Sequence, residues 1–410
     1  MNISKLLFLS LLATFLFSCD VTDNDSDDTA EIEVPATYEF SRNGESTVSF
    51  SGQTTRIKMG GELFAAMSDF DNTTEQLLLE MYRNQDENGG DVNPFSESEL
   101  NSSDKSVKSK VAASRDYFAS NVTQAAEIKN DFESWLSGQV NEVFPNQNQE
   151  ASAGVPGQIA DGSGARYINS QGLEYNQMVA KSMIGALMAD QMLNNYLSPS
   201  VLDEASNREE NDNGETAEGS NYTNMEHKWD EAYGYIYGTS ADPANPNPTI
   251  GSDDIFLNKY TGQVSDDDDF SSLDEDIFEA FKLGRAAIVA GDYEVRDEQA
   301  LIIREAVSKV IAVRAVFYLQ AGKSKIEDGN LGSAFHSLSE GFGFIYSLQF
   351  SRVPGTNQPY MSHSEVETML SDLLDDGQNG LWDLETSTLD AISDQIADKF
   401  DFTVEQAASN

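Results

Sequence analysis

The sequence predicts an all-α protein made of two related helical-bundle halves, with a small β element near its N-terminal end. Apolar residues at helical spacing dominate the chain from about residue 61 onward, whereas strand-like alternation is confined to residues 37–59. No part of the chain shows the strand–helix–strand alternation that builds a parallel sheet. One eleven-residue pattern occurs twice, and an internal duplication of a helical unit explains this repeat most simply.

Residues 1–18 have the pattern of a lipoprotein signal peptide. Lys5 precedes an apolar run over residues 6–17, which is too short to remain as a membrane-spanning helix. The run ends in Leu-Phe-Ser-Cys, which resembles the lipobox of bacterial lipoproteins and implies that Cys19 becomes the lipidated first residue of the mature chain. The alternative is an ordinary secretory signal that leaves Cys19, the only cysteine, as a free thiol.

Residues 19–36 are expected to form an acidic tether between the lipid anchor and the folded part. Acidic residues directly after a lipidated cysteine resemble the export signal of surface lipoproteins in Bacteroidetes. We therefore expect an outer-membrane lipoprotein of a Gram-negative bacterium, exposed to the periplasm or on the cell surface. The net charge of −45, from 25 basic and 70 acidic residues, excludes nucleic acid as a partner.

The N-terminal helical half is expected over residues 37–255. Asn43-Gly44 predicts a two-residue hairpin turn, and a third short strand is expected at Ile57 and Met59. Thr223 and Glu226 have the spacing of a capping box and predict the start of a helix. Between polar and glycine-rich loops, the apolar spacing predicts helices near 61–81, 104–121, 122–142, 171–197 and 224–238.

The C-terminal helical half is expected over residues 256–410. The chain between residues 239 and 271 is rich in proline and aspartate, so we interpret it as the loop that joins the two halves. Capping boxes are predicted where Ser272 precedes Glu275 and where Ser362 precedes Glu365. Helices are predicted near 272–290, 296–321, 328–348, 363–374 and 386–399.

The duplicated pattern begins at His227 and again at His336. Over eleven residues the two copies share His, Glu, Gly, Ile and Tyr at equal spacing. The Glu follows the His by four residues, so the two side chains share one face of the helix. A glycine follows each His by seven residues and lies on the same stripe, where a small residue lets another helix approach closely.

This stripe carries the residues that we expect to do chemistry. A helix N-terminus disfavours a charged imidazolium, so each His is expected to be neutral, the form that binds iron or zinc. Two such helices would supply ligands to one shared site or to two separate sites. The candidate metal ligands are His227, Glu231, His336 and Glu340. The accessory candidates are Asp230, Glu174 and Lys181.

Two resemblances add to this interpretation. The lipobox, the segments 40–45 (Phe-Ser-Arg-Asn-Gly-Glu) and 173–177 (Leu-Glu-Tyr-Asn-Gln), and the His-x-x-x-Glu helices together resemble uncharacterised Bacteroidetes lipoproteins known only as a domain of unknown function. More distantly, the His/acid helices and the two-half layout resemble imelysin-like proteins, which implies a role in iron uptake and an outer-membrane receptor as partner. This chain departs from the imelysin motif, because neither His follows a glycine by two residues and the shared acid comes at i+4.

The main rival is a surface glycan- or protein-binding lipoprotein whose His/Glu helices are purely structural. It would use exposed aromatic residues in loops, such as Tyr260, Tyr360 or Trp382. The polar stripe Glu174, Gln177 and Lys181 is expected to face solvent, with contact to a buried site as the alternative, and His363 is expected to be exposed. Enzymatic activity, including an imelysin-like metallopeptidase, is the weakest interpretation, because no His-Glu-x-x-His or Gly-x-Ser-x-Gly motif occurs.

Overall fold

In the computed structural model, which describes residues 32–409, the longest helix is α11 (Tyr293–Glu327). Its 35 residues span about 52 Å at 1.5 Å per residue. The middle of α11, residues 306–319, is almost entirely buried, because α10 (Leu273–Ala290), α12 (Leu331–Ser347) and α14 (Thr386–Ala397) pack against this helix. Its first turns keep an exposed stripe at Glu294, Glu298 and Ile302.

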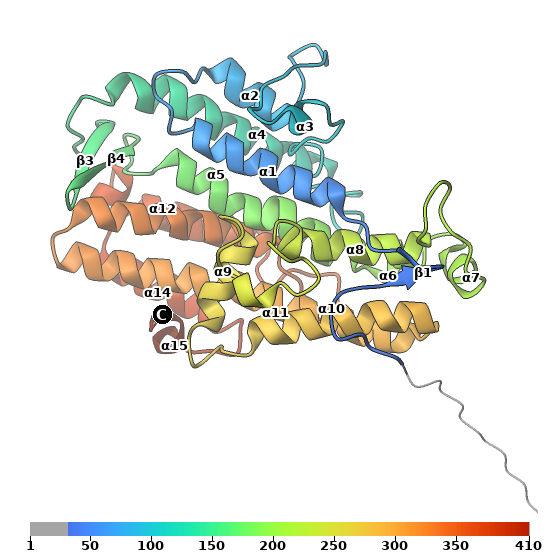
Figure 1. Ribbon diagram of the computed structural model, residues 1–410. Coiled ribbons are helices and arrows are strands. Elements are labelled where there is room, and N and C mark those ends of the chain that lie inside the picture. The colour runs from blue at the N-terminus through green and yellow to red at the C-terminus, as the bar shows by residue number, and fades with distance from the viewer. Residues whose placement is uncertain (1–31, 410) are drawn as a thin grey trace, which may run out of the picture. The chain divides into compact units, whose positions relative to one another are not determined.

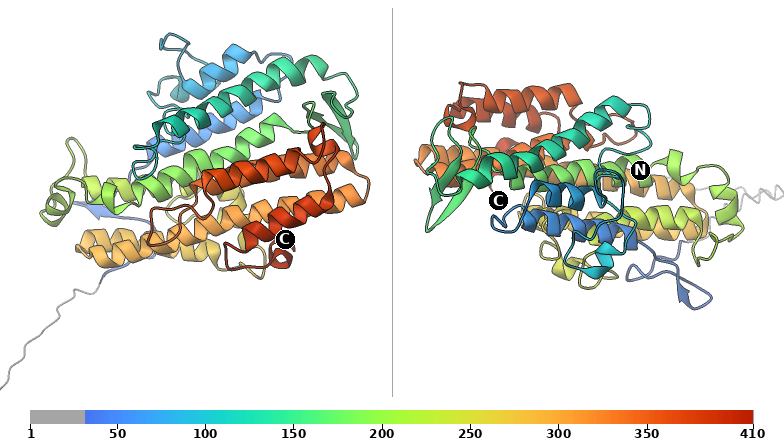
Figure 2. Two further views of the ribbon diagram at one scale, coloured as in Figure 1. Left: turned by 180° about the vertical axis from the view of Figure 1, so that it is seen from behind. Right: turned by 90° about the horizontal axis from the view of Figure 1, so that it is seen from above.

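The remaining helices form layers beside α11 (Figures 1 and 2). The next helix outward is α12, which packs between α11 and α5 (Tyr175–Met183). On the far side of α5 lie α1 (Ser51–Ala66) and α4 (Val122–Gly138). This order places α5 and α12 in the middle of the bundle, where each contacts helices on both sides.

The described residues contain fifteen α-helices and two small two-stranded sheets, so the all-α prediction with an N-terminal β element is confirmed. The strands are β1 (Ser41–Arg42), β2 (Glu45–Ser46), β3 (Gly157–Asp161) and β4 (Gly164–Ile168). The other helices are α2 (Glu75–Arg83), α3 (Ser98–Asn101), α6 (Pro199–Leu202), α7 (Asn207–Asp212), α8 (Asn224–Tyr237), α9 (Leu257–Ser265), α13 (His363–Leu374) and α15 (Val404–Ala408).

The N-terminal β element is smaller than predicted. Asn43 and Gly44 form the predicted turn between β1 and β2, with φ angles of 57° and 84° that suit asparagine and glycine. The third strand is wrong, because Ile57 and Met59 lie inside helix α1. The periodicity of a short apolar run cannot distinguish a strand from a helix. Here the segment packs against α8 as a helix.

The predicted helix over 104–121 is also wrong. Val107, Val111 and Phe118 are buried as a helix would bury them, but the chain follows a series of turns. Part of its backbone hydrogen-bonds to distant segments of the chain: the N–H of Ala112 donates to the carbonyl of Ala186 at 2.8 Å. These long-range bonds replace the i→i−4 ladder and stabilise the irregular conformation.

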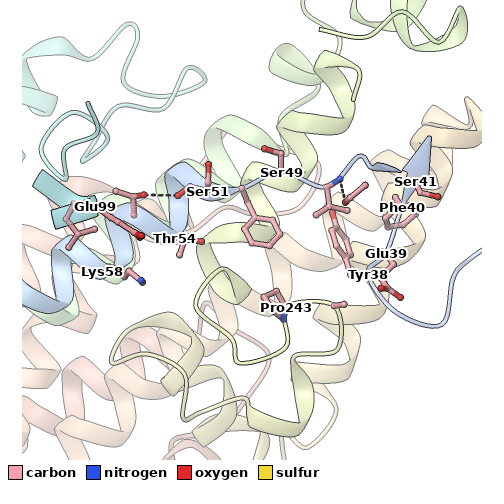
Figure 3. Close-up of a pocket in the computed structure, with 16 residues that line it drawn as sticks. Tyr38, Glu39, Phe40, Ser41, Ser49, Ser51, Thr54, Lys58, Glu99 and Pro243 are labelled. Atoms are coloured by element: carbon pink, nitrogen blue, oxygen red, sulfur yellow. Dashed lines mark hydrogen bonds between the residues drawn. The ribbon is translucent and has the colours of Figure 1, made fainter. Parts of the chain in front are cut away.

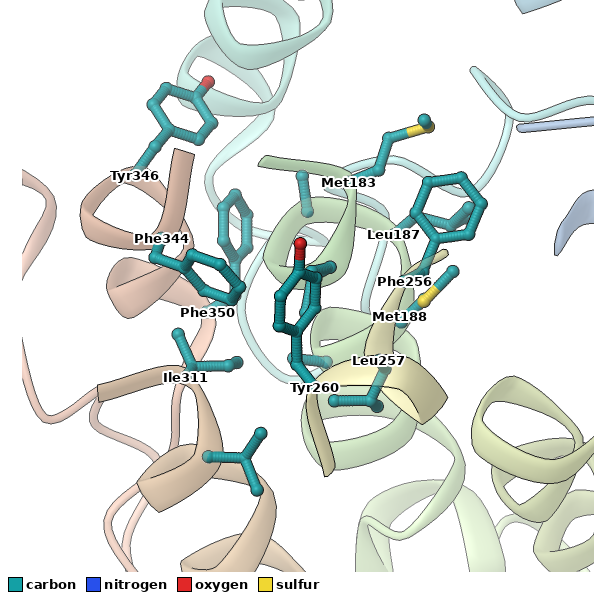
Figure 4. Packing of buried hydrophobic residues seen from close by; sticks show 14 of the residues in the cluster. Met183, Leu187, Met188, Phe256, Leu257, Tyr260, Ile311, Phe344, Tyr346 and Phe350 are labelled. Carbon is teal, nitrogen blue, oxygen red and sulfur yellow. The ribbon is translucent and has the colours of Figure 1, made fainter. Parts of the chain in front are cut away.

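The helix predicted over 171–197 forms, but only its first part is regular α-helix. After α5 the chain continues as π-helical turns over 184–189 and 192–196. Its side chains belong to the main core: Figure 4 shows Met183 and Leu187 beside Phe256 and Tyr260 of the α9 region. The prediction of a helix over 171–197 is therefore confirmed, and its π-helical geometry is not visible in the sequence.

Other elements depart from prediction in detail. The segment 143–170, expected to be a loop, contains the β3–β4 hairpin, and the segment 239–271 contains α9. The capping boxes at Thr223 and Ser362 are confirmed. The box at Ser272 is wrong, because the Ser272 hydroxyl donates to the Asp276 carboxylate and does not cap the backbone.

Several sequence predictions stay untested by the fold. The signal peptide, Cys19 and most of the tether lie outside the described residues. The division at residues 255/256 and the internal duplication stay predictions. Among residues 32–409, no helix has the length and apolar character needed to cross a membrane.

Candidate functional site

The second His/Glu pair lies at the interface of α12 and α5. His336 Nδ1 is 3.1 Å from a carboxylate oxygen of Glu174, and its Nε2 is 3.7 Å from Glu340. Glu340 also receives the Lys181 ammonium at 3.2 Å. The structure therefore joins two pairs of residues from distant parts of the sequence. One pair is His336 and Glu340 on α12, and the other is the accessory candidates Glu174, the N-cap of α5, and Lys181.

These contacts correct the expectation that the polar stripe of α5 faces solvent. Glu174, Gln177 and Lys181 are buried, with exposed fractions of 4%, 7% and 4%. Each charge of the stripe meets an opposite or hydrogen-bonding group on α12, which lets it remain in the interior. The sequence spacing showed the stripe, but it did not show which helix would cover it.

The Glu340 carboxylate is held in its charged form. Burial acts to raise the pKa of Glu340, but the Lys181 ammonium and His336 outweigh burial and keep that pKa below its usual value. The hydroxyl of Tyr260 donates a hydrogen bond to Glu340 at 3.2 Å. The carboxylate is thus surrounded by donors supplied by the protein itself.

The first His/Glu pair lies where α8 packs against α1. His227 Nδ1 is 3.0 Å from the carbonyl oxygen of Ser49, and the His227 ring stacks on Tyr222 with centroids 4.4 Å apart. Burial lowers the pKa of His227, so the ring is neutral near pH 7 and donates its Nδ1 proton to the carbonyl. Glu231 accepts a hydrogen bond from Gln53 at 3.1 Å and pairs with Lys228 at 3.3 Å.

Asp230 faces away from this pair. It forms an ion pair with the fully buried Arg285 at 3.0 Å and accepts a hydrogen bond from Tyr38 at 2.8 Å. It also accepts the backbone N–H of Ser49 at 3.1 Å. Ser49 is therefore fixed from two sides, with its carbonyl bonded to His227 and its N–H bonded to Asp230.

Both copies of the duplicated pattern use their glycine in the predicted way. A Cβ on Gly234 would lie 2.4 Å from the Cβ of Phe50, and a Cβ on Gly343 would lie 2.4 Å from the Cβ of Lys181. Each glycine therefore permits close approach of the neighbouring helix, α1 in one case and α5 in the other. The predicted close approach at the glycine is therefore confirmed in both copies.

Within residues 32–409, no group of three or more His, Cys, Asp and Glu side chains has the arrangement of a metal site. His336 has a carboxylate beside each of its two ring nitrogens, Glu174 at Nδ1 and Glu340 at Nε2. At both pairs, a lysine ammonium contacts the glutamate that would serve as the second ligand.

The exposed aromatic residues of the rival interpretation are mostly covered. Tyr260 is wholly buried, so its predicted exposure is wrong. Trp382 packs edge-on against Phe335, and Tyr360 stacks on Phe400, so both are half-buried. His363 is also half-buried, and its Nδ1 lies 2.8 Å from the side-chain oxygen of Gln349.

A groove of about 910 Å³ lies instead along the N-terminal segment, which the sequence did not single out (Figure 3). Its walls come from the β1–β2 region, the start of α1, α3 and the segment 243–244. The lining combines hydroxyl groups with aromatic rings, two carboxylates and one ammonium. Its polar members are Glu39, Ser41, Ser46, Ser49, Ser51, Thr54, Thr55, Lys58 and Glu99, and its rings are Tyr38, Phe40 and Phe50.

The groove is held in shape by buried contacts beneath it. The Tyr38 ring stacks on Tyr233 of α8 with centroids 3.6 Å apart and planes 5° from parallel. The N–H of Tyr38 donates to the carbonyl of Ala244, which connects two walls. Ser49, in the groove wall, is the residue that His227 and Asp230 bind, so the first His/Glu helix supports the groove directly.

Comparison with known proteins gives a family but no activity. No curated protein and no solved structure matches the chain. One family, described as "Domain of unknown function (DUF4856)", matches residues 35–403, which covers nearly all of the folded part described above. The chain therefore belongs to the DUF4856 family, a domain of unknown function.

Proposed function

We propose that the protein is a binding protein of the cell envelope, tethered through a lipid on Cys19, that takes an oligosaccharide in the groove of its N-terminal segment. The observation that carries the proposal is the groove lining. Hydroxyls and carboxylates supply the donors and acceptors that sugar hydroxyls need, and the Phe40 and Phe50 rings offer apolar faces. A volume of about 910 Å³ suits a ligand of a few sugar rings.

The His/Glu helix then has a positioning role in this function. His227 and Asp230 bind the two backbone groups of Ser49 and so fix the wall of the groove. The second pair, His336 and Glu340, joins α12 to α5 in the core. Ion pairs and hydrogen bonds between buried groups can fix how helices pack without any bound metal.

A glycan array of neutral and acidic oligosaccharides, followed by titration calorimetry of each hit, tests the proposal. Ser51 is exposed on the groove wall, so Ser51→Trp should fill the groove and abolish binding. Glu99→Gln should weaken binding by about tenfold through loss of a charge-assisted hydrogen bond, whereas Glu127→Gln, exposed on α4 outside the groove, should not. Undiminished binding by Ser51→Trp, or no glycan hit at all, would refute the groove as the site.

Lipid anchoring is tested separately. Wild-type protein expressed in a Gram-negative host should fractionate with membranes and incorporate a labelled fatty acid. Cys19→Ala should lose the label and appear in the soluble fraction, because Cys19 is the only thiol in the chain. Equal labelling of the variant would contradict the assignment of Cys19.

Binding of iron or zinc, in an imelysin-like uptake role, is the second candidate. One observation favours it: His227 donates Nδ1–H to a backbone carbonyl, as metal-binding histidines do, and in this tautomer Nε2 carries the free lone pair. A metal that arrives in a chelate needs only one or two protein ligands, such as His227 with Glu231. Metal analysis of protein purified without chelator, beside a His227→Ala/His336→Ala variant, tests this; absence of stoichiometric metal between pH 6 and 8 would refute it.

A further inference from the structure

Three basic side chains surround the ring of Tyr260 in the core. The Lys181 ammonium is 5.3 Å from the ring centroid, the Lys259 ammonium 5.4 Å, and the guanidinium carbon of Arg314 5.4 Å. These groups come from α5, α9 and α11, so three elements converge on one ring. Such a gathering of cations is unexpected in a chain with 25 basic and 70 acidic residues.

Only one of the three cations has an anionic partner. Lys181 pairs with Glu340 at 3.2 Å. Neither Arg314 nor Lys259 forms an ion pair with any residue between 32 and 409, and the buried Nε of Arg314 has no hydrogen-bond partner. Arg314 is nevertheless only 3% exposed. A buried charge without a counter-charge is costly, so this place favours an anion.

The surroundings of Arg314 and Lys259 suit such a ligand. The guanidinium lies 4.1 Å from the ring centroid of Phe317 and 4.6 Å from that of Tyr318, which holds the planar group in place. Lys259 is half-buried on α9 and offers access from outside. Burial lowers the pKa of Lys259, and the charges of Lys181 and Arg314 lower it further against the opposing effect of Glu340.

We propose that Arg314, Lys259 and Lys181 form a binding site for a small oxyanion, either a carboxylate or a phosphate. The guanidinium presents paired N–H donors that match the oxygens of both groups, and the two ammonium groups add charge. None of these residues lines the groove of the N-terminal segment, so the site is independent of the proposed glycan binding. Bound anion would neutralise the unpaired charges of α9 and α11 and stabilise their contact.

The test measures anion binding by the folded protein in Tris–chloride buffer. Sodium phosphate, sodium acetate and sodium chloride are titrated at constant sodium concentration, because salt screening alone stabilises so acidic a protein. Melting temperature and calorimetric heat are recorded for wild type, Arg314→Gln, Arg314→Met and Lys309→Gln. Lys309 is the matched control, because it lies on the same helix but is not one of the three cations at the Tyr260 ring. Its ammonium pairs with Glu305 at 3.8 Å.

A saturable rise in melting temperature with phosphate or acetate is expected for wild type and Lys309→Gln, and the anion that saturates first identifies the ligand class. Arg314→Gln should weaken this binding about tenfold or more, the usual effect of removing a charge-assisted hydrogen bond. In chloride alone, Arg314→Met should melt no lower than wild type, because it removes an unpaired buried charge. Equal, unsaturable shifts with all three salts, saturation by chloride only, or a marked fall in the melting temperature of Arg314→Met would overturn the proposal.

Discussion

Replacing Gly343 by alanine should force α12 away from α5 and destabilise the protein. The added Cβ would lie 2.4 Å from the Cβ of Lys181 and 3.0 Å from the backbone nitrogen of Ser182. Ordinary carbon contacts begin at 3.4 Å, so the helices must separate by about 1 Å. Two of the three nearest atoms, the Ser182 nitrogen and the Met178 carbonyl oxygen at 3.1 Å, belong to the backbone, which has no alternative rotamer, so the strain cannot relax within the side chains alone.

The magnitude follows from two opposing terms. Overpacking in a rigid core costs about 3 kcal/mol at the upper end of its usual range. Replacing glycine by alanine within a helix raises the free energy of unfolding by about 1 kcal/mol, because alanine is the better helix former. The expected net loss in the free energy of unfolding for Gly343→Ala is therefore about 2 kcal/mol.

Gly341 provides a matched control on the same helix. A Cβ there meets its nearest neighbour, the Cβ of Tyr318, at 3.5 Å, which is an ordinary contact. Gly341→Ala should therefore raise the free energy of unfolding by about 1 kcal/mol. The two variants should differ by about 3 kcal/mol in the free energy of unfolding measured with urea. If Gly343→Ala were as stable as Gly341→Ala, the close approach of α12 and α5 would be refuted.

Three further predictions concern buried polar groups. Burial raises the pKa of Asp190 from 3.8 to about 6. The protonated Asp190 therefore adds about 3 kcal/mol to the free energy of unfolding below pH 4, and this contribution is lost as the pH rises through 6. Asp190→Asn should flatten that part of a plot of unfolding free energy against pH. Arg285→Gln should lower the free energy of unfolding by about 3–5 kcal/mol, because it leaves the buried Asp230 carboxylate without its ion-pair partner and removes one of the two arginines that pair with Glu226. Arg42→Gln, at a half-buried position, should lower it by only about 1 kcal/mol, because Arg285 still pairs with Glu226; equal losses would contradict this. Thr223→Ala should lower the free energy of unfolding by about 1 kcal/mol through loss of the α8 cap, and an unchanged urea midpoint would count against that cap.

Local chemistry made several features readable from the sequence. Asn43-Gly44 adopts the positive φ angles that its residue types favour, and the boxes at Thr223 and Ser362 satisfy free N–H groups of their own helices. The shared face of His336 and Glu340 also follows from helical spacing. Each depends on neighbours within a few residues, so no knowledge of the tertiary fold was needed.

Only the tertiary structure decided where the polar groups of the core find their partners. The segment 104–121 has the apolar spacing of a helix, yet Asp190 accepts the N–H groups of Ala113 and Ser114 and holds the chain in turns. The sequence pattern predicts that Lys181 faces solvent, but α12 buries it and pairs it with Glu340. Such contacts join residues more than 70 positions apart, which local periodicity does not report.

The sequence by itself determined that this is an all-α chain with a duplicated His/Glu pattern, because helical period and equal spacing are local properties. The groove needed the fold, since its walls come from residues near 40, 100 and 243 that only packing brings together. The cluster of cations around Tyr260 needed it for the same reason, because α5, α9 and α11 each supply one charge. A residue's type fixes which bonds it can form, and the fold fixes which partners lie within reach.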